Sequence, residues 1–206
     1  MLQLDIFSTP VYIDEIKNFN LSENFLNKFK ERQQDIKKQK QIKPLIKHIK
    51  NLSNKIFNDS YLIDCKNYKV DVVSMWINKL RSNQNHPPHM HRSSLLSGIY
   101  FPCENNNYPD LNFLRPYAIP FLPITKKLNN INSNTCNLPY VKNRIYMFPS
   151  YIYHFVNVNN SLNTRITIAF DVLLRGVYGE QQETLDVGKY NILIYLIIIG
   201  ILVIGK

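Results

Sequence analysis

The strongest constraint on the fold is a change in the character of the sequence at Tyr68. From there to about residue 173, short runs of Val, Ile, Tyr and Phe are interrupted by clusters of Asn, Pro and Ser. Short runs bounded by turn-forming residues are typical of all-β barrels and sandwiches. We therefore expect a mainly β core with Asn-rich loops at residues 102–110 and 125–139. The expected strands are residues 70–78, 95–101, 111–114, 144–147, 152–156 and 164–173.

Helical periodicity precedes the β region. Ser22 is a suitable N-cap, and apolar residues near the 3.6-residue period predict a helix from there to about Lys38. A second apolar stripe after Pro44 predicts another helix that includes Ile56. Each helix has one apolar face, so both should pack on the sheet. Residues 4–13, which are apolar and contain a proline, are expected to form an edge strand or an extended lead-in.

These elements divide the chain into four segments. Residues 1–67 should supply a strand and supporting helices to the same domain as the β core, which we place at residues 68–175. Residues 176–189 are expected to be a linker. Residues 190–206 form an apolar C-terminal tail, in which residues 192–205 carry no charged side chain. This run is shorter than the about 20 apolar residues that span a bilayer, so a membrane anchor and a packed terminal element both stay open.

The composition fits a globular domain, with 45% hydrophobic and 19% charged residues among 206. The widely spaced Cys65, Cys103 and Cys136 predict neither a disulfide framework nor a cysteine zinc site, and they favour a reducing compartment such as the cytoplasm. The N-terminus lacks a signal-peptide pattern. The net charge of +10 is compatible with a nucleic acid or an anionic membrane. Aromatic residues are not interleaved with basic ones at a fixed spacing, so we do not expect nucleic-acid binding.

Histidines are concentrated in the β region. His89 and His91 project from the same face of an extended segment, so both imidazoles can reach one metal ion. A third ligand must come from elsewhere in the fold, and His154 is the histidine of the β region that lies outside the cluster at residues 86–91. Imidazoles with open coordination positions suit Fe(II), Zn, Cu or Ni. Two strand histidines are equally compatible with surface or hydrogen-bonded positions without any metal.

A second polar pair follows on an expected strand. Arg165 and Thr167 share one face of the alternating run at residues 165–170, while Ile166 and Ile168 share the other. An arginine that points into a barrel needs an anion beside it, because an unpaired guanidinium is costly to bury. A dicarboxylate co-substrate would supply that charge.

With these residues in this order and spacing, the sequence resembles the double-stranded β-helix oxygenases that depend on Fe(II) and 2-oxoglutarate. Within that superfamily it resembles a group with members in bacteria and their phages. The resemblance covers about residues 4–174. The segments that carry it are Ile-Phe-Ser-Thr-Pro-Val-Tyr at 6–12, Trp-Ile-Asn at 76–78, His-Met-His-Arg-Ser-Ser-Leu-Leu-Ser-Gly-Ile-Tyr-Phe at 89–101, and Met-Phe-Pro-Ser at 147–150 followed by His154 and Arg165.

The resemblance implies a jelly-roll or cupin-like barrel and an enzyme that uses Fe(II), 2-oxoglutarate and O2 to hydroxylate or demethylate a substrate. It implies no catalytic residue beyond the metal ligands. Trp76 and Asn78 also match, and we expect them to support packing and a turn. The implied cofactor residues are His89, His91 and His154 for the metal, and Arg165, Thr167 and Tyr100 for 2-oxoglutarate.

The sequence departs from the superfamily at one ligand position. The wider superfamily places Asp or Glu two residues after the first histidine, whereas position 91 is a histidine here. This leaves open whether His91, His86, Glu104 or Asp110 completes the metal set. A cupin-like three-histidine metalloenzyme that does not use 2-oxoglutarate is an alternative function, and so is a non-catalytic, membrane-associated binding module. For an oxygenase, we expect a small molecule or a peptide as the substrate.

Overall fold

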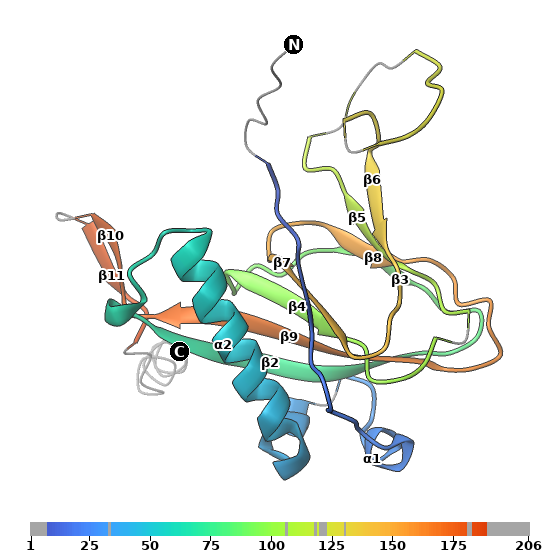
Figure 1. The fold of residues 1–206 in the computed structure, drawn as a ribbon, viewed down its shortest axis with the longest axis horizontal. Coiled ribbons are helices and arrows are strands. Elements are labelled where there is room, and N and C mark those ends of the chain that lie inside the picture. The colour runs from blue at the N-terminus through green and yellow to red at the C-terminus, as the bar shows by residue number, and fades with distance from the viewer. Residues whose placement is uncertain are drawn as a thin grey trace, which may run out of the picture.

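Two antiparallel sheets face each other in the computed structural model, which describes residues 8–188 except residues 33, 106, 118, 120–122, 130 and 181–182 (Figure 1). Apolar side chains from both sheets pack together between them, among them Phe148 and Leu111. The expected mainly β fold with N-terminal helices is confirmed. In hydrogen-bonded order, the five-stranded sheet contains β1 (Tyr12–Glu15), β7 (Arg144–Pro149), β4 (Leu96–Tyr100), β9 (Arg165–Arg175) and β2 (Lys69–Leu80), and the four-stranded sheet contains β3 (His86–His89), β8 (His154–Val156), β5 (Leu111–Leu114) and β6 (Thr135–Leu138).

Strand β9 has an apolar face and a polar face. Ile166, Ile168 and Phe170 point toward the N-terminal helices and belong to the larger apolar core. The alternate residues point to the opposite face, between the two sheets. Both faces are covered, so the first eight residues of the strand are all buried. The side chains that point between the sheets are, in order, Arg165, Thr167, Ala169 and Asp171.

The long helix α2 (Lys43–Asp59) covers the outer face of the five-stranded sheet (Figure 1). Pro44 occupies its first turn, where a missing amide proton costs no hydrogen bond. Leu45, Ile49 and Ile56 lie on one stripe and are buried against the sheet. The helix expected after Pro44 is therefore confirmed. The 3-10 helices η2 (Lys40–Ile42) and η3 (Cys65–Asn67) flank it in the sequence.

The helix expected between Ser22 and Lys38 is wrong beyond its first turns. Ser22 does cap α1 (Glu23–Asn27), because its hydroxyl accepts a hydrogen bond from a first-turn amide at 3.2 Å. The chain then leaves the helical path, since Arg32 has a φ of 59° and its amide donates to the carbonyl of Ile77 on β2 at 2.8 Å. It ends in the 3-10 helix η1 (Gln34–Lys38). A hydrogen bond to the sheet thus overrides the helical periodicity.

A hairpin follows β9 where the sequence indicated a linker. Strands β10 (Val177–Glu180) and β11 (Glu183–Asp186) pair in antiparallel fashion, so the linker interpretation is wrong for these residues. The Tyr178 hydroxyl donates to the carbonyl of Leu174 at 2.7 Å and ties the hairpin to the end of β9. The expected apolar tail, residues 190–206, lies outside the described residues. Within the described part of the chain, no helix combines the length and apolar character needed to cross a membrane.

Gly98 lies in the middle of β4, where there is no room for a side chain. A Cβ atom at this position would lie 2.5 Å from Cε2 of Phe170 and 3.0 Å from the carbonyl oxygen of Tyr146. Strand β4 is hydrogen-bonded on both sides, to β7 and β9, so it cannot move away. We expect Gly98→Ala to lower the free energy of unfolding by about 1–3 kcal/mol through overpacking, as measured by urea denaturation. Adding Phe170→Leu should recover part of this loss, and an unchanged stability of Gly98→Ala would contradict the prediction.

Candidate metal and co-substrate site

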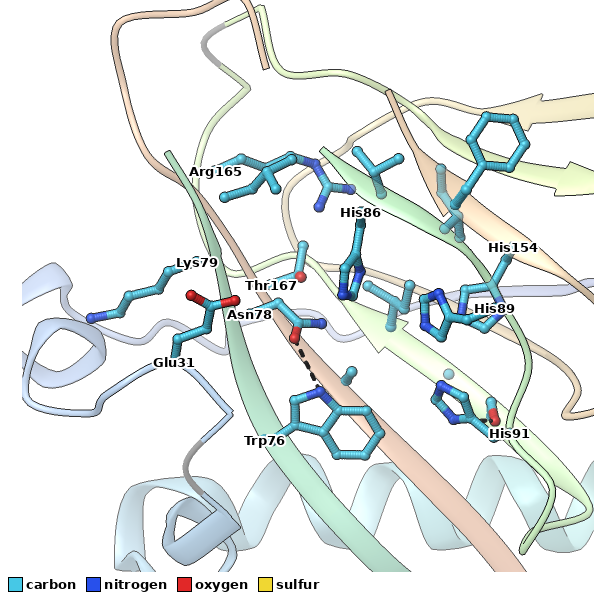
Figure 2. Close-up of a pocket in the computed structure, with 18 of the residues that line it drawn as sticks. Glu31, Trp76, Asn78, Lys79, His86, His89, His91, His154, Arg165 and Thr167 are labelled. Atoms are coloured by element: carbon cyan, nitrogen blue, oxygen red, sulfur yellow. Dashed lines mark hydrogen bonds between the residues drawn. The ribbon is translucent and has the colours of Figure 1, made fainter. Parts of the chain in front are cut away.

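A pocket lies between the two sheets, on the polar face of β9 (Figure 2). Arg165 lies at one end of it and a group of three histidines at the other, with His86 between them (Figure 2). Strand β2 contributes Trp76 and Asn78 to the wall. Of the residues singled out in the sequence for metal or 2-oxoglutarate, the pocket brings together His89, His91, His154, Arg165 and Thr167.

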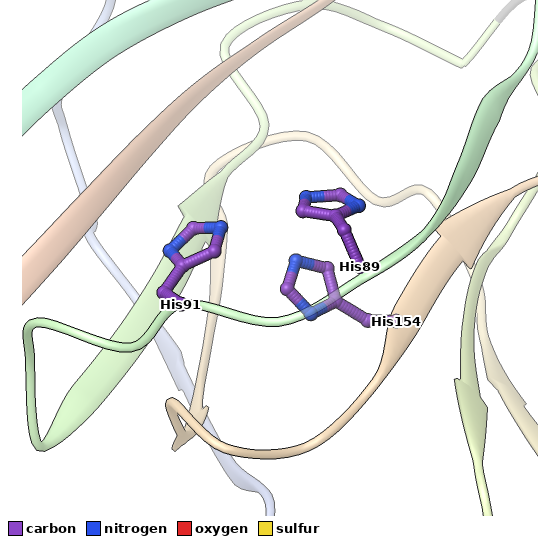
Figure 3. A group of neighbouring side chains, drawn as sticks. All are labelled: His89, His91 and His154. Carbon is purple, nitrogen blue, oxygen red and sulfur yellow. The ribbon is translucent and has the colours of Figure 1, made fainter.

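The three histidines come from two neighbouring strands and the loop after one of them (Figure 3). His89 ends β3 and His154 begins β8, and the two residues are partners in the antiparallel pairing. His91 follows two residues after His89. One ring nitrogen from each histidine can be chosen so that all three lie within 4.8 Å of one another. Three donor atoms this close can bind one metal ion.

Hydrogen bonds fix which nitrogen of each ring is available. Nδ1 of His89 lies 2.8 Å from the carbonyl of Pro87, and Nδ1 of His154 lies 3.1 Å from the carbonyl of Ile152. Nδ1 of His91 lies 2.6 Å from Oδ1 of Asp171. Carbonyl and carboxylate oxygens only accept hydrogen bonds, so each Nδ1 carries the proton. Each Nε2 therefore keeps a free lone pair, which is the state that a metal-binding imidazole needs.

Burial favours the neutral form of His154, His89 and His86. His154 is 4% exposed, and its burial, with the neighbouring His89 as a smaller cause, lowers its pKa to about 3. Burial also lowers the pKa of His89. For the neighbouring His86, burial is again the largest cause and lowers the pKa to about 4. Neutral rings do not have to release a proton before they bind a metal at neutral pH.

The buried histidines predict acid sensitivity of the metal-free protein. In the unfolded chain His154 takes up a proton near pH 6.5, whereas the folded protein keeps it neutral until about pH 3. Between these values the unfolded state binds more protons, so the free energy of unfolding falls as the pH falls, by up to about 1.4 kcal/mol per pH unit for this residue. Urea denaturation between pH 7 and pH 5 measures this slope. His154→Gln should have a shallower slope than the unsubstituted protein, and equal slopes would count against the assignment.

Arg165 is a buried cation with an unused donor. It is 3% exposed, and its Nε donates to the carbonyl of Pro109 at 3.1 Å. Its guanidinium carbon lies 5.7 Å from the ring centroid of Phe101 and 5.3 Å from that of Tyr140. Its Nη2 is buried and has no hydrogen-bond partner among the residues that the structure describes. Burial lowers the pKa of Arg165 to about 10, which leaves it charged at neutral pH.

The unused donor of Arg165 indicates an anion site. A buried guanidinium is costly unless its protons are matched by acceptors. Thr167 lies two residues further along β9 on the same face, is 1% exposed, and also lines the pocket. A carboxylate between these two side chains would accept from both. The anion expected from the sequence therefore has a suitable place in the pocket.

Tyr100 does not lie in this pocket, which corrects the expectation that it lines it. On β4 it has the same orientation as Gly98 and faces the helices, where it belongs to the larger apolar core. Its hydroxyl donates to Oδ1 of Asn143 at 2.8 Å, and its ring packs on Phe19 at a centroid distance of 5.7 Å. Ser97 and Ile99 are the β4 residues whose side chains face the pocket.

Neither acidic alternative joins the histidine group. The side chain of Glu104 is exposed and pairs with Lys142 at 2.8 Å. Asp110 accepts a hydrogen bond from Asn137 at 3.0 Å. His86 lines the pocket, with its ring centroid 4.7 Å from that of His89, but it is not part of the group of three.

Trp76 and Asn78 form part of the pocket wall. Both lie inside strand β2, so the turn role expected for them is wrong. The indole nitrogen of Trp76 donates to Oδ1 of Asn78 at 3.0 Å (Figure 2). The Trp76 ring lies 5.5 Å from the ring of His91, centroid to centroid. These two residues therefore shape the space beside the histidine group.

Residues 74–171 match the protein-family model described as "Putative 2OG-Fe(II) oxygenase". The match begins in β2, ends at Asp171 in β9, and includes the three histidines, Arg165 and Thr167. Residues 74–171 are a 2OG-Fe(II) oxygenase domain of this family. The oxygenases of this family use Fe(II), 2-oxoglutarate and O2. No curated protein matches the sequence.

Several solved structures are similar to this chain in fold. An oxidoreductase of the 2OG-Fe(II) oxygenase family from Burkholderia pseudomallei has a TM-score of 0.50 and 10% identity, over 79% of this chain and 68% of its own. The non-heme alpha-ketoglutarate-dependent epimerase SnoN from nogalamycin biosynthesis has a TM-score of 0.50 and 10% identity, over 73% of this chain and 63% of its own. A prolyl-4-hydroxylase from Pseudomonas putida has a TM-score of 0.48 and 11% identity, over 67% and 68%. At these identities, the two matches with a TM-score of 0.50 show the double-stranded β-helix fold and nothing beyond the fold.

Proposed function

We propose that the pocket is the active site of a 2-oxoglutarate-dependent oxygenase that hydroxylates an organic substrate. In this proposal His89, His91 and His154 bind Fe(II), and Arg165 with Thr167 binds the far carboxylate of 2-oxoglutarate. The observation that carries the proposal is Nη2 of Arg165, a buried donor that has no partner among the described residues and lies in the same pocket as three imidazoles.

The donor set fits the metal. Each of the three imidazoles has a protonated Nδ1 and so keeps a lone pair on Nε2. One ring nitrogen from each histidine lies within 4.8 Å of the other two, and imidazole is a suitable ligand for Fe(II). Three protein ligands leave further coordination positions for 2-oxoglutarate and O2. Fe(II) in this site would couple the decarboxylation of 2-oxoglutarate by O2, which yields succinate and CO2, to the insertion of one oxygen atom into a C–H bond of the substrate.

Arg165 and Thr167 set the orientation of 2-oxoglutarate. The guanidinium is held in place before binding, because Pro109 accepts from its Nε and two aromatic rings flank it. Binding therefore costs little side-chain entropy. The Thr167 hydroxyl can donate a second hydrogen bond to the same carboxylate. With this end fixed, the keto acid end would extend along the pocket toward the histidine group.

The substrate is proposed to enter beside Trp76 and Asn78. The indole N–H of Trp76 donates to Oδ1 of Asn78. The amide nitrogen of Asn78 therefore remains as a hydrogen-bond donor at this wall of the pocket. Glu31 lies at the same side of the pocket, whereas Nζ of Lys79 points away from it and donates to the carbonyl of Asn27 at 3.4 Å (Figure 2). A small polar molecule or a peptide segment fits these features.

Anaerobic titration of the full chain tests the proposed function. We expect stoichiometric binding of Fe(II), followed by binding of 2-oxoglutarate with a weak visible charge-transfer band. In air, without substrate and with ascorbate as the reductant, slow conversion of 2-oxoglutarate to succinate should follow. Pyruvate is the matched control ligand, because it has the keto acid but lacks the far carboxylate that Arg165 would hold. It should bind much more weakly than 2-oxoglutarate.

Three results would contradict the proposal in different ways. Tight Fe(II) binding with no response to 2-oxoglutarate would favour a cupin-like metalloenzyme that works without this co-substrate. No stoichiometric metal binding would favour a non-catalytic binding module. Equal affinity for pyruvate and 2-oxoglutarate would remove the role of Arg165 and Thr167.

A further inference from the structure

His91 differs from the other two histidines in how its ring is held. His89 and His154 each donate from Nδ1 to the carbonyl of the residue two positions earlier, so their own backbone orients them. His91 donates instead to the side chain of Asp171, 80 residues away on β9, at 2.6 Å. Asp171 is 7% exposed. The orientation of one of the three rings thus depends on a distant, buried carboxylate.

Asp171 is itself held by a network of hydroxyl groups. Ser97 lies directly opposite it in the pairing of β4 with β9, and the Ser97 hydroxyl donates to the same Oδ1 at 2.7 Å. The hydroxyl oxygens of Ser97 and Ser150 lie 2.9 Å apart, and Ser94 donates to Ser150 at 2.8 Å. The backbone amide of His91 donates to the carbonyl of Ser150 at 2.9 Å. The network therefore fixes both the ring and the backbone of His91.

The location of this carboxylate points to a role at the metal. Burying a carboxylate is costly, and an apolar residue at the same position on β9 would pack without that cost. The group of three imidazoles has no negative charge of its own. A carboxylate that accepts from the far nitrogen of a metal-binding imidazole fixes its tautomer and raises its basicity. Asp171 is placed to do both for His91.

We propose that Asp171 is a positioning residue for the metal site. It holds His91 with the proton on Nδ1 and Nε2 turned to the metal, and through this ring it supplies the carboxylate charge that three neutral imidazoles lack. Ser97 holds Asp171 in place. This inference rests on the proposed function, because it assumes that His91 binds a metal.

Two substitutions of Asp171 separate orientation from charge. In Asp171→Asn the amide oxygen can still accept from Nδ1, so we expect the tautomer of His91 to persist while the charge is lost. In Asp171→Ala both the charge and the carboxylate acceptor are lost, the Ser97 hydroxyl oxygen 3.0 Å from Nδ1 is left as a weaker, neutral acceptor, and His91 should populate both of its tautomers. We expect the affinity for Fe(II) to fall by about 10–100-fold in Asp171→Asn and by at least as much in Asp171→Ala. Anaerobic Fe(II) titration of the full chain measures the affinity, and 15N NMR of the histidine side chains in the metal-free protein measures the tautomer.

Asp71→Asn is the matched control. Asp71 lies on β2 in the same sheet, pairs with Arg175 at 3.0 Å, and is not part of the pocket lining. This variant should bind Fe(II) as tightly as the unsubstituted protein. Ser97→Ala removes one donor to Asp171 but keeps the bond to His91, so its loss of affinity should be smaller than that of Asp171→Asn. If Asp171→Ala does not fold, Asp171→Asn and Ser97→Ala still carry the test.

The possible failures can be told apart. If the unsubstituted protein binds Fe(II) and Asp171→Asn binds it equally well, the charge role of Asp171 is overturned and the proposed function stands. If His91 in folded Asp171→Ala keeps the proton on Nδ1, the orienting role is overturned. If the unsubstituted protein does not bind Fe(II), the proposed function fails and this inference fails with it.

Discussion

Arg165→Met is expected to lose 2-oxoglutarate binding and to retain the fold. Removing one partner of a buried, hydrogen-bonded charge pair costs about 2–5 kcal/mol of binding free energy. At 1.4 kcal/mol per tenfold change, this predicts an affinity for 2-oxoglutarate that is weaker by about 30-fold to several thousand-fold. Binding of Fe(II) should be unchanged, because the side chain of Arg165 lies at the opposite end of the pocket from the histidine group (Figure 2).

The same substitution should not destabilise the protein when 2-oxoglutarate is absent. The lowered pKa of Arg165, about 10 against 12.5, reports a cost on the order of 3 kcal/mol for keeping this guanidinium charged in the fold. Methionine removes that cost but also removes the hydrogen bond to Pro109 and the contacts with two rings. We expect the free energy of unfolding to stay equal or to rise by about 1–2 kcal/mol. Thermal denaturation of the two Fe(II)-bound proteins measures the effect of the ligand. Adding 2-oxoglutarate should raise the melting temperature of the unsubstituted protein but not that of Arg165→Met.

Arg175→Met provides the comparison. Arg175 lies on the same strand, pairs with Asp71, and is outside the pocket lining. It should bind 2-oxoglutarate normally. Normal 2-oxoglutarate binding by Arg165→Met would show that the co-substrate lies elsewhere, and a large loss of stability would show that Arg165 is a structural residue.

His89→Ala and His154→Ala should each lose Fe(II) binding. A protein ligand of the metal contributes more than the groups behind it, whose removal costs about 10–100-fold in affinity, so we expect a loss of at least about 100-fold. His89 is only partly buried and its removal should affect stability little. His154 is 4% exposed, so His154→Ala should also lower stability by opening a cavity. Anaerobic Fe(II) titration measures the affinity, and circular dichroism checks the fold.

Two other histidines serve as controls for this experiment. His48 lies on α2 and pairs with Asp14 at 2.8 Å, outside the pocket lining, so His48→Ala should bind Fe(II) normally. His86→Ala tests the alternative ligand that the sequence left open. We expect it to keep Fe(II) binding. If it loses binding while His91→Ala keeps it, the ligand set contains His86 in place of His91.

The sequence predicted strands best where alternation and β-branched residues coincide. Strand β5 was predicted with its bounds, and β9 to within two residues of each end. The short strands β3 and β6 were missed. Their sequences, His-Pro-Pro-His and Thr-Cys-Asn-Leu, have little intrinsic strand preference, and pairing with β8 and β5 keeps them extended. Residues 4–13 contributed an edge strand only at their end, as β1, and residues 1–7 lie outside the described part of the chain.

The site was predictable where residue type alone indicates chemistry. The clustered histidines can be recognised in the sequence, and so can Arg165 on its alternating strand. The pocket brings these residues together. The prediction for Tyr100 was wrong because successive residues of a strand point to opposite faces of the sheet. Ile99 faces the pocket, so Tyr100, the next residue, faces the helix-covered core. Asp171 was missed, although it lies six residues after Arg165 and so shares its face of β9. Its partner, Ser97, could be found only from the pairing of β4 with β9.

The short hydrogen bond between His91 and Asp171 makes two distant sequence positions interdependent. A carboxylate introduced at position 91 would lie beside the buried carboxylate of Asp171, and like charges at this separation repel strongly. Such a change is compatible with the fold only if position 171 becomes neutral at the same time. The effects of substitutions at the two positions should therefore not add. A change from three histidine ligands to two histidines and a carboxylate therefore requires substitutions at both position 91 and position 171. Either substitution alone is unfavourable.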